Sequence, residues 1–264
     1  MRAADYAYFD ATFIPYAHRG GAKYPPNLHR ENTEFAFAQA VAMGYRYLET
    51  DVHATVDGVL LAFHDPRLDR VTDRSGIIAE LPYAAVQEAL IGGTDPIPTL
   101  AELFVRFPQA RFNIDAKSDL AVDLLADTIE EHEAHDRVCL SSFGVNRLHR
   151  LRRRLGKRVA SAATLHGVAW NVFAPALTRV LNTPAAALQM PVDSLILGRR
   201  RRVLTPALVR AVHRAGKQVH VWTIDDASRM EELIDAGVDG IFTDRIDTLK
   251  AVLTQRGLWT ANEV

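Results

Sequence analysis

Three ionisable side chains alternate along one short run of the sequence: Glu49, Asp51 and His53 are spaced by two. Side chains two residues apart share one face of a β-strand, so we expect these three to lie together. Neighbouring carboxylates repel one another unless a positive charge lies between them. A hard divalent cation such as Mg²⁺ or Ca²⁺ meets this need, with Asp115 from the next parallel strand as a third oxygen ligand. Ligation by oxygen alone argues against zinc.

The same carboxylates are also compatible with an ion-pair network that includes Arg19 or Lys117, and the spacing leaves both interpretations open. Two histidines, His18 and His64, stand beside charged residues in the same pattern. An imidazole, with an ordinary pKa of roughly 6.5, gives and accepts protons at neutral pH. The Arg19 guanidinium is a planar fork that suits a phosphate or a carboxylate. A divalent cation, two histidines, an arginine and a lysine together predict phosphoester chemistry.

The elements that must position these residues are short β-branched runs that alternate with longer helical patterns. We expect strands at residues 13–18, 46–52, 59–63, 111–115, 137–141, 158–162, 185–189, 218–222 and 240–243. We expect helices at residues 33–43, 99–106, 119–134, 144–154, 170–181, 205–215, 226–236 and 247–254. Strands that alternate with helices indicate βαβ units and a parallel sheet.

Nine strands are one too many for an eight-stranded barrel, and the turn chemistry identifies the extra one. Asp57-Gly58 joins the second and third strands with no room for a crossover helix. Such a tight turn makes the two strands antiparallel, whereas neighbours in this kind of barrel are parallel. The third run is therefore a β-hairpin arm, and the other strands form a (β/α)₈ TIM barrel of the α/β class.

A single domain is expected over residues 1–264, with a small insertion at about residues 65–98 after the second strand. With 31 Lys+Arg and 32 Asp+Glu, the chain has no overall field to attract nucleic acid. No apolar run reaches the roughly 18 residues of a transmembrane segment. The single Cys139 excludes an internal disulfide and a cysteine zinc site. The N-terminus lacks a signal-peptide pattern, so we expect a cytoplasmic protein.

In a barrel of this kind the chemistry lies at the carboxyl ends of the strands. Ionisable residues gather at these ends, while apolar residues fill the strand bodies. The ends carry, in chain order, His18-Arg19, Glu49 to His53, Asp115 to Lys117, Gln189, Trp222 and Asp244. We therefore predict one site at this end of the barrel, with Gln189 among the residues that bind substrate.

An ordered set of motifs carries a resemblance to a known family. Along the chain the set comprises His18-Arg19-Gly20-Gly21, Glu31-Asn32-Thr33, Glu49-Thr50-Asp51-Val52, His64-Asp65, Asn113-Ile114-Asp115-Ala116-Lys117, Ser142-Phe143, Trp222-Thr223 and Gly237 to Asp244. Through these motifs the chain resembles the glycerophosphodiester phosphodiesterase family from about residue 13 to 250. Each motif alone is weak, whereas the ordered set is highly specific. The resemblance implies a (β/α)₈ barrel with a small insertion and a divalent metal.

The resemblance also implies a role for each matching residue. His18 and His64 match a general acid and base pair, whose individual assignments stay open. Arg19 matches a residue that stabilises the phosphate. Lys117 matches the lysine of the family's Leu-Glu-Ile-Lys-like run, and Trp222 matches an aromatic residue beside the substrate. We expect both of these residues to contact substrate.

The metal ligands are likewise implied by the resemblance, with one departure. Glu49 and Asp51 match two ligands, and Asp115 occupies a third position where the family commonly has Glu. Because Asp is one methylene shorter, the ion must sit closer or a water must bridge. A second departure is Asp225, which stands where the family often has Asn and adds a negative charge near the pocket rim.

The implied activity is hydrolysis of glycerophosphodiesters to glycerol 3-phosphate and an alcohol. The glycerol hydroxyl next to the esterified one attacks phosphorus, the alcohol leaves, and water opens the resulting cyclic phosphate. One histidine removes the hydroxyl proton and the other protonates the leaving oxygen, which accelerates the reaction by roughly 10²–10⁴-fold. The implied partner is a small-molecule glycerophosphodiester, with one divalent cation, Mg²⁺ or Ca²⁺, as the cofactor.

Two other functions stay open. A lysophospholipase D or phospholipase-like phosphodiesterase acts on lipids with the same apparatus, and apolar residues at 165–175 are candidates for its lipid-facing rim. A non-catalytic barrel that only binds phosphodiesters is the other alternative, although the two histidines and three carboxylates argue against it. Arg199 to Arg202, expected in the loop after the seventh barrel strand, carry a further hypothesis. One of them would hold an anionic head group, unless they simply form a solvated basic face.

Overall fold

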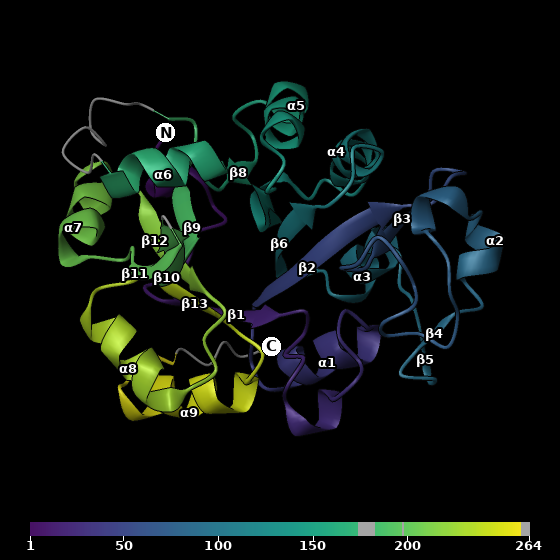
Figure 1. Ribbon diagram of the computed structural model, residues 1–264, viewed down its shortest axis with the longest axis horizontal. Helices are drawn as coiled ribbons and strands as arrows, with labels where there is room; N and C mark the ends of the chain where they lie inside the picture. Colours follow the sequence, from purple (N-terminus) through teal and green to yellow (C-terminus); the bar gives the residue numbers. More distant parts are fainter. Residues whose placement is uncertain (174–182, 197, 260–264) are drawn as a thin grey trace.

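Eight parallel strands form a nearly closed barrel in the computed structural model, which describes residues 1–173, 183–196 and 198–259 (Figure 1). In chain order they are β1 (Ile14–His18), β2 (Tyr47–Ala54), β6 (Arg111–Ala116), β7 (Val138–Ser141), β8 (Ala160–Ser161), β9 (Ala187–Pro191), β12 (Gln218–Trp222) and β13 (Gly240–Thr243). The last strand, β13, pairs with the first, β1. One bridge between Ala162 and Ala187 joins β8 to β9 and completes the ring. The predicted TIM barrel is confirmed.

Helices cover the outside of this barrel (Figure 1). They are α1 (Glu34–Ala42), α3 (Leu100–Arg106), α4 (Ala121–Glu131), α5 (Val145–Leu155), α6 (Leu165–Phe173), α7 (Pro206–Arg214), α8 (Ala227–Asp235) and α9 (Ile246–Gln255). Thr99 and Glu102 form a capping box at the start of α3, and the Thr205 hydroxyl caps α7. Such side chains satisfy backbone N–H groups that lack partners within the helix. In the part of the chain that the structure describes, no helix has the length and apolar character needed to cross a membrane.

The alternation of side chains along the strands creates two apolar layers. Outward-facing residues such as Leu48 and Ile114 pack against the helices in the larger core. Inward-facing residues such as Tyr16 and Tyr47 form a second core within the barrel. There Phe242 stacks on Tyr16, with 4.0 Å between the ring centroids. This aromatic layer fills the barrel interior below the strand ends, so the open end is the one where the polar residues gather.

A hairpin and an insertion follow β2, as predicted. Strand β3 (Leu60–Ala62) runs antiparallel to β2, with Val52 beside Ala62. The insertion has its own small apolar core, which includes Phe63 and Ile78. It lies beside the barrel at the right of Figure 1. Its short elements are the 3₁₀-helix η3 (Ile78–Glu80), the helix α2 (Tyr83–Val86) and the strands β4 (Leu90–Ile91) and β5 (Asp95–Pro96). Three further 3₁₀-helices lie outside the insertion in the described residues: η1 (Ala3–Asp5), η2 (Pro25–Asn27) and η4 (His135–Arg137).

The region after β8 differs from the expectation. The helix predicted at 170–181 begins earlier, at Leu165, and residues 174–182 lie outside the described part of the chain. The prediction of a loop at Arg199 to Arg202 was wrong. Strands β10 (Asp193–Ile196) and β11 (Arg199–Arg202) pair there as an antiparallel hairpin. Pairing satisfies the backbone N–H and C=O groups of the arginine run. Four consecutive arginines have no apolar alternation, so the sequence pattern could not reveal this strand.

Candidate active site

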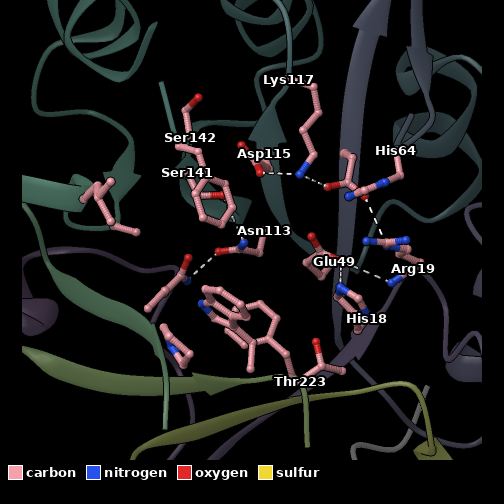
Figure 2. Close-up of a pocket in the computed structure, with 18 of the residues that line it drawn as sticks. His18, Arg19, Glu49, His64, Asn113, Asp115, Lys117, Ser141, Ser142 and Thr223 are labelled. Atoms are coloured by element: carbon pink, nitrogen blue, oxygen red, sulfur yellow. Dashed lines mark hydrogen bonds and ion pairs between the residues drawn. The ribbon is translucent and has the colours of Figure 1, made fainter. Parts of the chain in front are cut away.

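A cavity of about 260 Å³ opens at the carboxyl ends of the barrel strands (Figure 2). Its walls come from β1, β2, β6, β7, β9, β12 and β13 and from the residues that follow β3 and β8. Apart from the arginines of the Arg199 to Arg202 hypothesis, every residue predicted to act on substrate or metal lines this cavity: His18, Arg19, Glu49, Asp51, His64, Asp115, Lys117, Gln189 and Trp222. The barrel therefore brings the predicted residues into one place, while their individual roles stay predictions.

Strand register places the polar side chains in two layers. His18 pairs with Glu49 in neighbouring parallel strands, and Glu49 pairs with Asn113. Two residues further along β2, Asp51 pairs with Asp115. Paired residues of parallel strands point to the same side of the sheet, so both layers face the barrel interior. The expected sharing of one strand face by Glu49 and Asp51 is therefore confirmed.

His18 lies at the end of β1 between two carboxylates. Its Nδ1 is 2.6 Å from Asp244 Oδ1, and its Nε2 is 3.7 Å from Glu49 Oε2. Burial disfavours the charged imidazole, but the negative charges of Glu49 and Asp244 outweigh burial and raise the pKa of His18. The bond to Asp244 keeps a proton on Nδ1, which leaves Nε2 for chemistry at the cavity.

The Arg19 side chain reaches the same region because its backbone turns sharply. Its φ of 51° lies in the left-handed region, and Gly20 continues the turn with a φ of 83°. A Cβ at Gly20 would approach the Cβ of Ala36 within 2.8 Å, so this close packing requires glycine. The Arg19 guanidinium donates to Glu31 Oε1 at 3.1 Å, and its Nε lies 3.4 Å from Asp51 Oδ2. The guanidinium is thereby held at the cavity wall.

Lys117 Nζ lies between two buried carboxylates (Figure 2). It is 2.9 Å from Asp51 Oδ1 and 2.7 Å from Asp115 Oδ2. Burial by itself lowers the pKa of the ammonium, but the two carboxylates raise it to about 12. Burial likewise raises the pKa of Asp51, yet Lys117 and Arg19 bring it below its ordinary value. At Asp115 burial prevails and the pKa is raised. These contacts form the ion-pair network that the sequence left open beside a metal site.

Glu49 is the cavity carboxylate whose negative charge is balanced least by neighbouring positive groups. It is 6% exposed and accepts a hydrogen bond from the Arg19 backbone N–H at 3.2 Å. Burial and repulsion by Asp51 raise the pKa of Glu49 to about 7. A buried carboxyl group that keeps its proton near neutral pH marks a place where further positive charge would bind favourably.

His64 stands just beyond β3 and is oriented by the next residue. Its Nδ1 is 2.6 Å from Asp65 Oδ1, and Asp65 is bound in turn by Arg70. Burial opposes ionisation of Asp65, but Arg70 and His64 lower its pKa to about 2. His53 donates from Nε2 to the His64 backbone oxygen at 3.1 Å and is not among the cavity walls. His53 therefore supports the segment that carries His64.

Some residues of the cavity, such as Asn113, Ser141 and Phe143, were given no role from the sequence. Gln189 Nε2 donates to Asn113 Oδ1 at 2.6 Å, and Asn113 Nδ2 donates to Ser141 Oγ at 3.5 Å. Phe143 packs edge-on against Trp222, with 5.9 Å between the ring centroids. Asn113 and Phe143 belong to recognised motifs, and the position of Asn113 two residues before Asp115 was a usable signal. The bonds between strands depend on register, which no local pattern reveals.

Asp225 has a supporting contact that the sequence did not show. Its Oδ1 accepts the Asp244 backbone N–H at 2.9 Å, and its Oδ2 lies 2.7 Å from Lys23 Nζ. Lys23 Nζ is also 3.0 Å from Asp244 Oδ2. The expected free charge at the pocket rim is therefore paired, and it fixes the carboxylate that orients His18.

The exposed arginines of β11 belong to a different surface. Arg200 lies 3.3 Å from Asp193, and Arg202 lies 2.8 Å from Glu232. None of these four arginines is among the described residues that form the cavity wall. The hypothesis that one of them holds an anionic head group therefore has no support from the cavity wall and stays a prediction.

The carboxylates of the cavity fit a hard cation in their chemistry but are arranged around Lys117. Glu49, Asp51 and Asp115 offer oxygen donors only, as Mg²⁺ and Ca²⁺ prefer. Asp115 Oδ1 is buried and has no hydrogen-bond partner among the described residues, so this oxygen is available as a ligand to a cation. Yet no group of three or more His, Cys, Asp or Glu side chains in these same residues is arranged to hold a metal ion. The metal stays a prediction.

Comparison with known proteins gives likenesses over nearly the full length. The model of the glycerophosphoryl diester phosphodiesterase family matches residues 18–248. The chain belongs to this family. As a family member it is a phosphoric diester hydrolase. The protein named "Probable glycerophosphodiester phosphodiesterase 2" from Mycobacterium tuberculosis is 40% identical over 250 residues, which cover 93% of this chain and 92% of that protein.

Solved structures of the family share the fold. The crystal structure of the protein named "Putative glycerophosphoryl diester phosphodiesterase" from Silicibacter pomeroyi matches with a TM-score of 0.78 at 21% identity, over 96% of this chain and 99% of that one. A phosphodiesterase from Oleispira antarctica, solved with its product sn-glycerol-3-phosphate, matches with a TM-score of 0.76 at 24% identity, over 94% and 99%. At these low sequence identities, the two structures show that the barrel fold is shared, and nothing more.

Proposed function

We propose that this family member hydrolyses glycerophosphodiesters to glycerol 3-phosphate and an alcohol, with His18 and His64 as the proton-transfer pair. The arrangement of the two imidazoles carries the proposal, because they line one cavity. Each bonds through Nδ1 to a carboxylate at 2.6 Å, His18 to Asp244 and His64 to Asp65. Each therefore has its Nδ1 proton fixed and its Nε2 available to substrate. Two such groups suit a reaction that removes one proton and delivers another.

The proposed reaction follows from the chemistry of the substrate. The glycerol hydroxyl next to the ester attacks phosphorus, and the P–O bond to the alcohol breaks. One histidine Nε2 accepts the hydroxyl proton, and the other histidine gives a proton to the departing oxygen. In the second half, water attacks the cyclic phosphate and the two histidines exchange roles. After the full cycle, each histidine has returned to its starting protonation state.

Two positively charged side chains of the cavity wall, Arg19 and Lys117, stabilise the negative charge that develops on the phosphoryl group. The Arg19 guanidinium is held by Glu31 and Asp51, and the Lys117 ammonium is held by Asp51 and Asp115. Because these bonds position both cations before substrate arrives, the cations stabilise negative charge with little reorganisation. The planar Arg19 fork also matches two phosphate oxygens at once.

We further propose that Glu49, Asp51 and Asp115 bind one divalent cation, Mg²⁺ or Ca²⁺. The support is the oxygen-only donor set, the unpartnered Asp115 Oδ1 and the raised pKa of Glu49. A bound cation would neutralise charge on the phosphoryl oxygens. Lys117 Nζ contacts two of the same carboxylates, so the ammonium and the ion compete for their oxygens.

The test is release of glycerol 3-phosphate from glycerophosphocholine by purified protein, with Mg²⁺ or Ca²⁺ and with EDTA. We expect release with one of the ions and loss of activity with EDTA. His18→Ala and His64→Ala should each nearly abolish turnover, whereas His149→Ala, an exposed position on α5, should not. Absence of release from every glycerophosphodiester with either ion would refute the proposed activity and favour a barrel that only binds.

One observation favours a second class of substrate. Phe143 and Leu165 line the cavity and are 59% and 57% exposed. Exposed apolar side chains at a pocket rim are typical of a surface that contacts an acyl chain. A lysophospholipid, assayed beside glycerophosphocholine, therefore tests a lysophospholipase D activity. Faster turnover of the lipid would make it the preferred substrate.

A further inference from the structure

A buried hydrogen-bond network lies beneath the cavity and is not used by the proposed proton transfers. Gln189 Nε2 lies 3.5 Å from His220 Nδ1, and the Tyr16 hydroxyl lies 3.3 Å from the same nitrogen. On the other side of the ring, His220 Nε2 is 2.9 Å from Gln218 Oε1. His220 and Tyr16 are each 0% exposed, so the centre of the network is shielded from water, whereas Gln189 and Gln218 are partly buried.

These contacts determine which His220 nitrogen carries the proton. Gln218 Oε1 is only an acceptor, so His220 Nε2 must be the donor in that bond. Burial lowers the pKa of His220 to about 3, so the ring is neutral and its Nδ1 carries no proton. The single lone pair of the unprotonated Nδ1 is shared by two donors, the Tyr16 hydroxyl at 3.3 Å and the Gln189 amide at 3.5 Å. The tautomer of His220 is therefore defined by its neighbours.

The tautomer of His220 in turn fixes the orientation of the Gln189 amide. Both acceptors beside this amide, His220 Nδ1 and Asn113 Oδ1, face its nitrogen, which donates to them. A flipped amide would point its oxygen at two acceptors and lose both bonds. Within the described residues, no hydrogen bond uses Gln189 Oε1, and Gln189 lines the cavity. The Gln189 carbonyl oxygen is thus oriented by its neighbours and is available to accept a hydrogen bond from a molecule in the cavity.

We propose that Gln189 Oε1 accepts a hydrogen bond from the glycerol hydroxyl that takes no part in the reaction, and that His220 is the residue that positions this amide. The inference rests on the proposed function and specifies how its substrate is recognised. Glycerol in a phosphodiester has two free hydroxyls, and the reaction uses the one next to the ester. The remaining hydroxyl is a donor and suits a site that offers only an acceptor.

The position of Gln189 favours the glycerol moiety over the departing alcohol. Gln189 bonds to Asn113, which pairs in register with Glu49, so the amide belongs to the layer of the reacting groups. The exposed rim of the cavity is apolar, with Phe143 and Leu165. An alcohol that varies between substrates fits the open rim, whereas the constant glycerol fits the buried layer.

The decisive comparison uses two substrates that differ by one hydroxyl. Glycerophosphocholine has the terminal hydroxyl, and the phosphocholine diester of propane-1,2-diol lacks it but keeps the hydroxyl that attacks phosphorus. An acceptor that the bound substrate covers and leaves without a donor disfavours the second substrate by about 10- to 100-fold in kcat/KM. We expect the wild-type protein to show this preference. Equal kcat/KM values for the two substrates would overturn the inference.

Variants assign the preference to the network. Gln189→Met keeps the side-chain length without the amide, and His220→Phe keeps a buried ring without the acceptor nitrogen. Each should reduce the preference to less than about 3-fold, because the oriented acceptor is lost. General damage to the fold would instead slow both substrates alike. Gln87→Met, at an exposed position, is the matched control and should keep the full preference. A full preference in Gln189→Met would refute the role of this residue.

Binding measurements separate this inference from the proposed activity. Calorimetry with glycerol 3-phosphate and with propane-1,2-diol 1-phosphate requires no turnover. Tighter binding of glycerol 3-phosphate by about 10-fold or more is expected for the wild-type protein, with no difference for Gln189→Met. Hydrolysis without any such preference overturns the Gln189 contact alone. Binding with this preference but without hydrolysis overturns the proposed activity alone, and the absence of both overturns both.

Discussion

Replacing Glu49 with glutamine should stabilise the metal-free protein above neutral pH and abolish its turnover. Glu49 is 6% exposed and lies beside Asp51, so its ionised form is both desolvated and repelled. Glutamine has nearly the same shape, carries no charge, and can still accept the Arg19 backbone N–H. The substitution thus removes an unfavourable charge while it removes a proposed ligand of the divalent cation.

The magnitude follows from the pKa of Glu49, which is about 7 in the folded protein and ordinarily 4.5. Between these two values the folded state binds more protons than the unfolded state. Stability therefore falls as the pH rises from 4.5 through 7. The difference of about 2.5 between the two pKa values corresponds to a loss of about 3 kcal/mol in the free energy of unfolding, at roughly 1.4 kcal/mol per pKa unit. This penalty is complete above about pH 8 and absent below about pH 4.

The assay is urea unfolding of wild type and Glu49→Gln in EDTA at pH 5 and at pH 8.5. The variant should match the wild type to within about 1 kcal/mol at pH 5 and exceed it by about 3 kcal/mol at pH 8.5. Glu231→Gln, at an exposed position of α8, is the control and should change stability by less than about 0.5 kcal/mol. Addition of Mg²⁺ or Ca²⁺ at pH 8.5 should stabilise the wild type but not the variant.

Two results would refute this reasoning. If Glu49→Gln were no more stable than the wild type at pH 8.5, the buried carboxylate would be fully compensated. If its added stability were the same at both pH values, the effect would come from packing and not from a raised pKa.

Three further predictions concern other residues. Lys117→Met should lower the free energy of unfolding in EDTA by about 3–5 kcal/mol at pH 8, because two buried carboxylates lose their partner; a loss below about 1 kcal/mol in urea unfolding would contradict the ion-pair network. His18→Ala and His64→Ala should each lower kcat by at least about 100-fold with little change in Tm; more than a tenth of the wild-type rate in both variants would dismiss the proton-transfer pair. Thr99→Ala should cost about 1 kcal/mol in stability through the lost cap of α3 and leave kcat unchanged; an altered kcat would show that α3 does more than support the barrel.

Features of the fold that depend on near neighbours were predictable from the sequence. The alternation of strand and helix patterns defined the parallel barrel, and Asp57-Gly58 identified the antiparallel β3. Turn chemistry and side-chain periodicity act over a few residues, so a linear pattern records them. The β10–β11 hairpin was missed although its strands are close in the sequence, because the four consecutive arginines of β11 have no apolar alternation.

The pattern of residues along the chain was enough to predict which side chains gather at one end of the barrel. Every site residue predicted at a strand end lines the cavity, because residues at the carboxyl ends of parallel strands must converge. Spacing also placed Glu49 and Asp51 on one face of a strand. It left open whether a metal or an ion pair balances their charge, since that choice depends on atoms from other strands.

The pairing of these side chains, in contrast, depends on contacts between residues that are far apart in the sequence. His18 finds Asp244, 226 residues away, and Lys117 places its ammonium between Asp51 and Asp115. The oriented amide of Gln189 requires acceptors from two other strands. Hydrogen bonds and pKa shifts depend on distances of a few ångströms and on burial, and these arise only when strand register and packing bring distant residues together.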